Sequence, residues 1–144
     1  MTEQDTIKLL RECDAGIKMG VSTINEVLPH TYSGTLRSLL SDCRYEHEML
    51  DQELRELLCE YGDKGKNPNP IVKGMSYIKT EAALLVTEGD STIARIMTDG
   101  CNMGVKSLSK YLNEYRAADE RSRSIAKRLI DSEERLCRDM RVYL

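Results

Sequence analysis

Residues 19–28 read MGVSTINEVL, and residues 103–112 read MGVKSLSKYL. The two stretches share Met, Gly, Val and the final Leu, and two further positions pair Thr with Ser and Ile with Leu. Both lie in segments whose apolar residues recur every three or four positions, which is typical of an amphipathic helix. The repeat therefore predicts that the first helix has a structural counterpart in the second half of the chain.

Apolar periodicity and helix-end signals divide the 144 residues into five segments. Pro29 ends the first segment and Gly62 ends the second. Asn69 followed by Pro70 is a good cap and first-turn pair for the third. We expect helices over residues 3–28, 34–61, 70–88, 91–115 and 120–143, all within one domain that spans residues 1–144.

Two similar helical hairpins, over residues 3–61 and 90–144, can pack as a four-helix bundle. The connection over residues 62–89 must then cross the bundle, because the helices that it joins run in the same direction. A helix of about 18 residues spans roughly 27 Å, which is long enough. The sequence predicts an all-α, up-down four-helix bundle with a crossover helix. Gly20 and Gly104 each cost about 1 kcal/mol inside a helix, so we expect them to allow close helix approach.

Composition and charge argue against several classes of partner. The net charge of −3 and the pI near 5.5 provide no general attraction to nucleic acid or to an anionic membrane. No apolar run approaches the ~20 residues of a membrane span, and MTEQDTIKLL lacks signal-peptide character. We expect a cytoplasmic protein without a nucleic-acid or membrane partner. Its five cysteines form no CxxC pair, so we expect reduced thiols that act as small buried hydrophobes.

Asp14, His47 and Glu133 each interrupt an otherwise apolar helix seam. If the first hairpin turns near residues 30 and 31, Asp14 and His47 are equally far from the turn and face each other. We favour a buried Asp14–His47 hydrogen bond that fixes the helix register. Either Arg44 or Glu133 would complete this polar core.

Two other interpretations of these residues stay open. In the first, Asp14, His47 and Glu133 bind a single divalent metal ion, with Glu46 or Cys43 as a further ligand. Cys43 and His47 are four residues apart on one helix face, which suits zinc. In the second, a rotation of the helices exposes these side chains to solvent.

Three segments carry a resemblance to a known family: CDAGIKMG at 13–20, RYEHEMLDQELRELLCEYG at 44–62 and DGCNMGVKSLSKYL at 99–112. They resemble a family of small uncharacterised bacterial ferritin-like proteins. That family has an Asp-Gly early in the first helix and an Arg-x-x-His followed by spaced leucines in the second. The matching residues are Asp14 with Gly16 (one residue further apart than in the family), then Arg44, His47 and Leu54. The resemblance implies a ferritin-like bundle and little about activity.

The sequence departs from the di-iron pattern of ferritin-like enzymes. Those enzymes take a Glu from each of two helices and a Glu-x-x-His motif from each of the other two. Here Arg44 precedes His47 by three residues, and Leu136 follows Glu133 by three. The only other histidine, His30, lies in the turn after Pro29. A standard di-iron site is therefore not expected.

Two functional classes follow from these observations. The first is a non-catalytic bundle that acts by self-association or partner binding, in a bacterial stress or spore role that the resemblance suggests. The second is a metal-binding or redox protein with a reduced site at the three seam residues. We favour the first and expect no cofactor. Apolar stripes on all five expected helices exceed what one bundle interior needs, so we also expect a homodimer built by two-fold packing of helix faces.

Overall fold

The computed structural model describes residues 2–68 and 89–144, which form helices and connecting segments without any strand. Four long helices are present: α1 (Thr2–Val27), α2 (Gly34–Glu60), α4 (Asp90–Glu114) and α5 (Glu120–Met140). Short 3-10 helices follow α1 (Leu28–His30) and α5 (Arg141–Tyr143). The all-α, four-helix prediction is confirmed, and the helix bounds agree to within three residues. The expected crossover helix over 70–88 lies outside the described residues.

Side-chain caps begin two of these helices. The hydroxyl of Ser33 accepts a hydrogen bond from the N–H of Leu36 at the start of α2. The carboxylate of Asp119 accepts one from the N–H of Ser122 at the start of α5. Such caps satisfy backbone donors that have no partner within the helix. Both cap positions could be recognised from the sequence.

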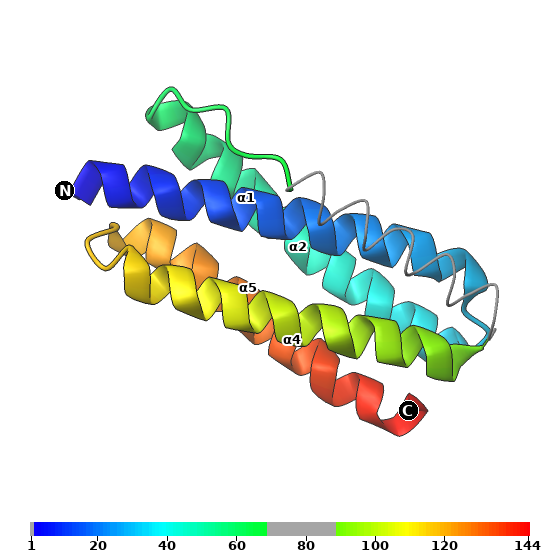
Figure 1. Ribbon diagram of the computed structural model, residues 1–144. Coiled ribbons are helices and arrows are strands. Elements are labelled where there is room, and N and C mark those ends of the chain that lie inside the picture. Colours follow the sequence, from blue (N-terminus) through cyan, green and yellow to red (C-terminus); the bar gives the residue numbers. More distant parts are fainter. Residues whose placement is uncertain (1, 69–88) are drawn as a thin grey trace.

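The four helices form two antiparallel hairpins, α1 with α2 and α4 with α5 (Figure 1). Asp90, the first residue of α4, accepts hydrogen bonds from the N–H groups of Tyr32 and Ser33, just before α2 begins. At the other end of the bundle, Asp5 in α1 accepts one from the N–H of Ala117, just before α5. Therefore α2 and α4 begin at the same end and run in the same direction, as the two-hairpin prediction requires. No helix within the described residues is long and apolar enough to cross a membrane.

The bundle interior contains two apolar clusters. The first lies toward the start of α1 and the end of α2, and it includes Leu9, Leu54, Leu58, Leu112 and Ile125. The second lies toward the turn between α1 and α2, and it includes Ile24, Leu36, Leu40, Ile93 and Met140. Between the two clusters lies one residue from each helix. These four residues, Gly20, His47, Gly104 and Glu133, are called the polar layer below.

Candidate functional site

The register of the first hairpin separates Asp14 from His47. His47 faces Gly20 of α1, whereas Asp14 bonds to Arg55, eight positions further along α2. Eight residues correspond to about 12 Å along the helix axis. The structure does not form the predicted Asp14–His47 hydrogen bond, because the 3-10 helix Leu28–His30 prolongs α1 and the chain returns to α2 only through the extended residues 31–33.

His47 is instead paired with Glu133 of α5. The imidazole is 1% exposed, and its Nε2 lies 3.8 Å from Oε1 of Glu133. Its Nδ1 lies 2.9 Å from the backbone carbonyl of Cys43, one helical turn earlier. The thiol of Cys43 also lies 3.7 Å from Nδ1 and 3.7 Å from the Ser132 hydroxyl. The predicted approach of Glu133 from the last helix is confirmed, and its partner is His47.

These contacts fix where the protons of the pair lie. A carbonyl oxygen can only accept a hydrogen bond. Nδ1 of His47 therefore carries a hydrogen atom and donates a hydrogen bond to the backbone carbonyl of Cys43. Burial by itself lowers the pKa of His47, but the hydrogen bonds and charges of Cys43 and Glu133 outweigh burial and raise this pKa to about 10. Burial raises the pKa of Glu133, while the hydrogen bond and charge of His47 oppose that rise. The raised pKa of His47 favours the charged imidazolium, which lies beside the carboxyl group of Glu133 as an ion pair.

The repeated sequence motif accounts for the space around this pair. A Cβ atom on Gly20 would lie 3.1 Å from the imidazole of His47. A Cβ atom on Gly104 would lie 2.7 Å from the carboxyl carbon of Glu133, closer than side-chain carbons approach. The equivalent glycine of each hairpin thus faces the buried polar residue of the same hairpin. The space that these glycines leave is filled by polar side chains rather than by a neighbouring backbone.

The donor set does not match a di-iron site. Such a site takes carboxylates from all four helices, whereas α1 and α4 contribute glycine to the polar layer. Cys43 contacts the Nδ1 side of the His47 ring, and Glu133 contacts the Nε2 side, so the three cannot bind one ion together. Within residues 2–68 and 89–144, no group of three His, Cys, Asp or Glu side chains is arranged to hold a metal ion.

The remaining predicted site residues lie outside the polar layer. Arg44 is half-exposed and donates to Asn25 at 2.8 Å, with Glu48 4.0 Å away. Glu46 forms an ion pair with Arg135 at the surface. Neither residue contacts His47, so the predicted polar core of four residues is reduced to the His47–Glu133 pair.

Asp14 anchors the segment that follows α2. This carboxylate is fully buried, and it accepts hydrogen bonds from Lys18, from Arg55 and from the backbone N–H of Lys66. Gly65 packs directly against it, and a Cβ atom on Gly65 would overlap the carboxylate oxygen. These contacts hold residues 62–68 against α1, which explains why Asp14 occupies a seam position. They are called the Asp14 clamp below.

Cys13 and Cys101 do not resemble nucleophiles. Burial is the main cause that raises the pKa of the Cys13 thiol to about 12, and it also raises the pKa of Cys101. A thiol is reactive as its thiolate, which a raised pKa disfavours. Cys13, Cys43 and Cys101 are buried as expected, whereas Cys59 is exposed and Cys137 is half-buried. The expectation of burial was therefore wrong for Cys59.

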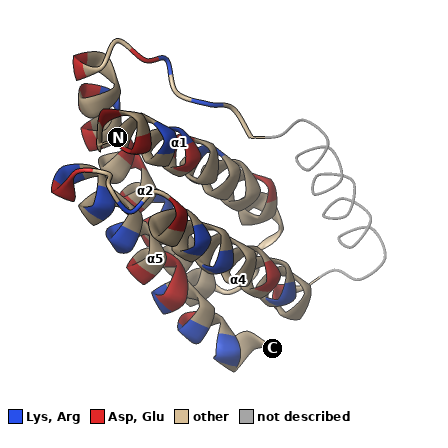
Figure 2. Ribbon diagram, turned by 60° about the vertical axis from the view of Figure 1, so that its left-hand side comes forward, with Lys and Arg blue, Asp and Glu red and all other residues tan. Residues whose placement is uncertain are grey.

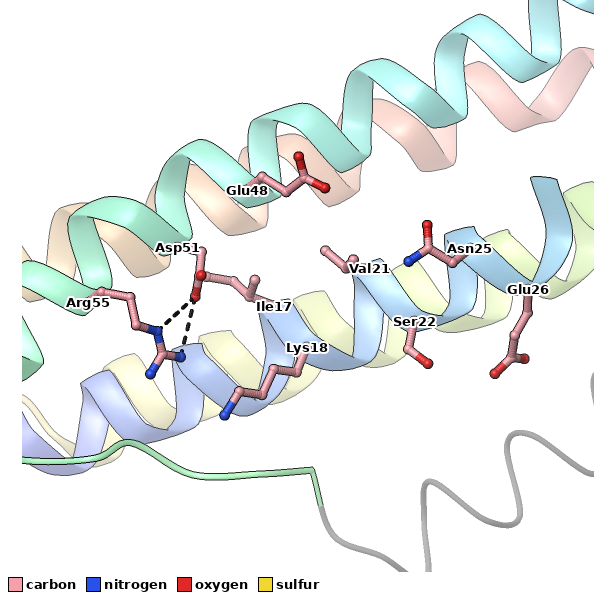
Figure 3. Close-up of a pocket in the computed structure, with 9 residues that line it drawn as sticks. All are labelled: Ile17, Lys18, Val21, Ser22, Asn25, Glu26, Glu48, Asp51 and Arg55. Atoms are coloured by element: carbon pink, nitrogen blue, oxygen red, sulfur yellow. Dashed lines mark hydrogen bonds and ion pairs between the residues drawn. The ribbon is translucent and has the colours of Figure 1, made fainter.

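A shallow groove of about 620 Å³ runs between α1 and α2 (Figure 3). Ile17 and Val21 line it together with polar and charged residues of both helices. Lys18 and Arg55, at one end of the groove, are both bonded to Asp14, so part of their charge is already neutralised. The groove therefore presents a mixed surface without a concentrated charge.

The opposite side of α2 forms a second surface with α5. Tyr45 and Met49, one turn apart on α2, are 63% and 45% exposed. They border a hollow of about 280 Å³ whose other lining residues are Glu46, Leu50, Arg128, Asp131 and Arg135. These seven residues are called the α2–α5 face below. Exposed aromatic and Met side chains beside Arg are typical of the centres of protein–protein interfaces.

Two rows of opposite charge run along α2 and α5, and they include Glu46, Arg128 and Arg135 of this face. The acidic row on α2 comprises Glu46, Glu53 and Glu60, and the basic row on α5 comprises Arg121, Arg128 and Arg135. Because the helices are antiparallel, the rows pair in reverse order at 2.8, 2.7 and 3.3 Å. In Figure 2, basic segments recur along α5 toward the C-terminus. This ladder was not predicted from the sequence, although the seven-residue spacing of both rows is visible there.

Neither a family model, nor a curated protein, nor a solved structure matches this chain. The geometry of the polar layer and of the α2–α5 face is therefore the basis for the function proposed next.

Proposed function

We propose that this protein is a non-catalytic, ferritin-like helical bundle that acts by self-association through the α2–α5 face. The observation that carries the proposal is the exposure of Tyr45 and Met49 beside a hollow on one face of the bundle. Burying two such side chains removes apolar area from water, which is the main favourable term in most protein–protein association. The homodimer expected from the apolar stripes is then formed at this face.

Several features support a non-catalytic role and a ferritin-like origin. The His47–Glu133 pair is enclosed between two apolar clusters, and neither residue lines the groove or the hollow. Two hairpins with parallel α2 and α4 are compatible with a crossover helix over residues 70–88 and with ferritin-like topology. On this proposal the protein is cytoplasmic and bacterial, and its association serves a stress or spore role, as the motif resemblance implies.

Analytical ultracentrifugation of the full chain tests self-association. We expect wild-type protein to sediment at about twice 16.4 kDa at high micromolar concentration. The double variant Tyr45→Glu/Met49→Glu should sediment as a monomer, because the apolar area that favours association is lost and two charged groups would have to leave water. The matched control is Met103→Glu on α4, where the wild-type side chain is 61% exposed and lies outside the α2–α5 face.

The outcomes separate clearly. A monomeric wild-type protein overturns the proposal, as does a Tyr45→Glu/Met49→Glu variant that still dimerises. Loss of the dimer in Met103→Glu alone would move the interface to α4. Circular dichroism of each variant checks that the helices are retained.

A second candidate function is metal binding at the polar layer, and one observation favours it. Oε2 of Glu133 is buried and has no hydrogen-bond partner, and His47 Nε2 lies beside the same carboxylate. His47 and Glu133 would supply two ligands to one divalent ion, with Asp14 excluded by the hairpin register. Elemental analysis of untagged protein purified without chelator tests this. Metal at one ion per chain that disappears in His47→Leu/Glu133→Leu supports binding, and a metal-free wild-type protein rejects it.

A further inference from the structure

We infer that two copies of this chain pair about a two-fold axis parallel to α2 and α5, which lays the acidic row of each copy on the basic row of the other. This inference rests on the proposed self-association and adds the geometry of the dimer. It is argued from the acidic row on α2 and the basic row on α5.

The two rows can bond to more than their own partners. Their side chains are between 38% and 63% exposed, so each pair keeps one side open to solvent. A carboxylate can accept about four hydrogen bonds, and a guanidinium carries five N–H donors. Each intramolecular pair in the ladder uses one or two of these. Donors and acceptors therefore remain for a second copy.

The antiparallel direction of α2 and α5 selects the axis. A two-fold axis that runs parallel to the helices, between them in the plane of the face, places α2 of one copy over α5 of the other without changing height. Glu46 of one copy then meets Arg135 of the second, and Glu53 meets Arg128. An axis in the same plane but perpendicular to the helices places α2 over α2 and α5 over α5. That arrangement sets like charges opposite each other, which costs free energy in an interface.

The apolar residues fit the same axis. Tyr45 and Met49 lie on the α2 side of the hollow, and Arg128, Asp131 and Arg135 lie on its α5 side. Because this axis keeps each residue at the same position along the helix direction, Tyr45 and Met49 of each copy approach the α5 side of the hollow of the other. Asp131 is the acidic residue on the α5 side of the hollow, and along α5 it lies between Arg128 and Arg135. The interface is then isologous, with the same patch used by both copies.

Two charge-reversed variants test this geometry. Variant A carries Glu46→Arg and Glu53→Arg, and variant B carries Arg128→Glu and Arg135→Glu. In the inferred dimer, each variant alone sets like charges opposite each other at two of the three ladder contacts and leaves the Glu60–Arg121 contact unchanged, so we expect its dimer Kd to rise at least about tenfold. A one-to-one mixture restores opposite charges at both contacts, so we expect an A–B dimer with a Kd near the wild-type value.

Competing geometries give different results. With α2 over α2 and α5 over α5, like charges already face each other in the wild-type protein and still do so in each variant. Variant A then dimerises alone about as well as the wild-type protein, and so does variant B. Either result overturns the axis while leaving self-association intact, as does a mixture that stays monomeric. A monomeric wild-type protein instead removes the proposed function itself, so the two failures are distinguishable.

Two further measurements keep the test decisive. Circular dichroism shows whether each variant keeps its helices, which we expect because exposed ion pairs contribute little to stability. If a variant loses its helices, the salt dependence of the wild-type Kd serves as the test in place of that variant. We expect the wild-type Kd to rise several-fold between about 50 and about 500 mM NaCl, since salt screens contacts between exposed charges. A Kd that does not change with salt overturns the inferred charge pairing.

Discussion

At the scale of single residues, the four members of the polar layer depend on one another. The equivalent glycines of the two hairpins, Gly20 and Gly104, face His47 and Glu133. A larger residue at either glycine would displace the polar side chain opposite it. Glycine is thus required there by a close side-chain approach, although it weakens the helix in which it lies.

Gly104→Ala is therefore expected to destabilise the protein by about 1–3 kcal/mol, because the overlap with Glu133 exceeds the gain in helix propensity. Urea unfolding followed by circular dichroism measures the change. Gly100→Ala on the same helix is the control, since a Cβ atom there meets nothing within 4 Å, and it should stabilise by up to about 1 kcal/mol. Adding Glu133→Ala should remove most of the penalty of Gly104→Ala. Equal effects at Gly100 and Gly104 would refute this explanation.

The His47–Glu133 pair predicts how stability depends on pH. The pKa of His47 is raised in the folded protein to about 10, from an ordinary value of 6.5. Its contribution is therefore complete below pH 6.5 and is lost as the pH rises toward 10. The raised pKa of Glu133 acts in the same direction, starting from its ordinary value of 4.5.

We expect the free energy of unfolding of the wild-type protein, measured against that of His47→Leu/Glu133→Leu, to fall between pH 6.5 and 10. The slope can reach about 1.4 kcal/mol per pH unit for one proton. Urea titrations at several pH values measure it. The double variant removes both partners, so it leaves no unpaired buried charge and should stay folded. Parallel pH profiles for the two proteins would show that the pKa of His47 is not raised in the folded protein.

At the scale of elements, Asp14 joins three parts of the chain: α1, α2 and the segment after α2. Removing its charge affects all three, because Lys18, Arg55 and the N–H of Lys66 all donate to it. We expect Asp14→Asn to destabilise the protein by about 1–3 kcal/mol, since at least one buried donor would lose its acceptor. Asp42→Asn on exposed α2 surface is the control and should change stability by no more than about 0.5 kcal/mol.

The readout that distinguishes this clamp is local. Amide hydrogen exchange at Lys66 should accelerate in Asp14→Asn and stay unchanged in Asp42→Asn, because the Lys66 N–H loses its acceptor only in the first variant. Unchanged protection at Lys66 would contradict the clamp.

At the scale of the whole molecule, apolar packing rather than the charge ladder holds the bundle together. Leu54 is fully buried in the first apolar cluster, so Leu54→Ala should cost about 2–5 kcal/mol. Arg121→Ala breaks one exposed pair of the ladder, that with Glu60, and should cost less than about 1 kcal/mol. Thermal and urea unfolding of both variants measure the contrast. A large effect of Arg121→Ala would show that the ladder contributes to folding as well as to association.

Local signals in the sequence were enough to predict the helices of the described residues and their pairing into two hairpins. Apolar spacing, the stop at Pro29 and the caps at Ser33 and Asp119 are local signals, and local signals predict helix bounds well. The two repeated glycines and the two interrupted seams at His47 and Glu133 are also visible in the sequence, but they were not predicted to lie together, because the glycines were expected to allow close helix approach.

Which polar residues meet depends on how the helices pack against one another. The Asp14–His47 pairing failed because it required the level at which the chain reverses to within a few residues. Leu28–His30 prolong α1 before the reversal, and the observed register differs from the expected one by about two helical turns. The clamp at Asp14 depends on Arg55 and on residues 62–68 folding back against α1, and neither contact follows from helix periodicity. Periodicity specifies the face of a helix on which a side chain lies. The height at which two helices pack depends on their connection and on the packing of both, so side-chain partners across helices are decided by the tertiary structure.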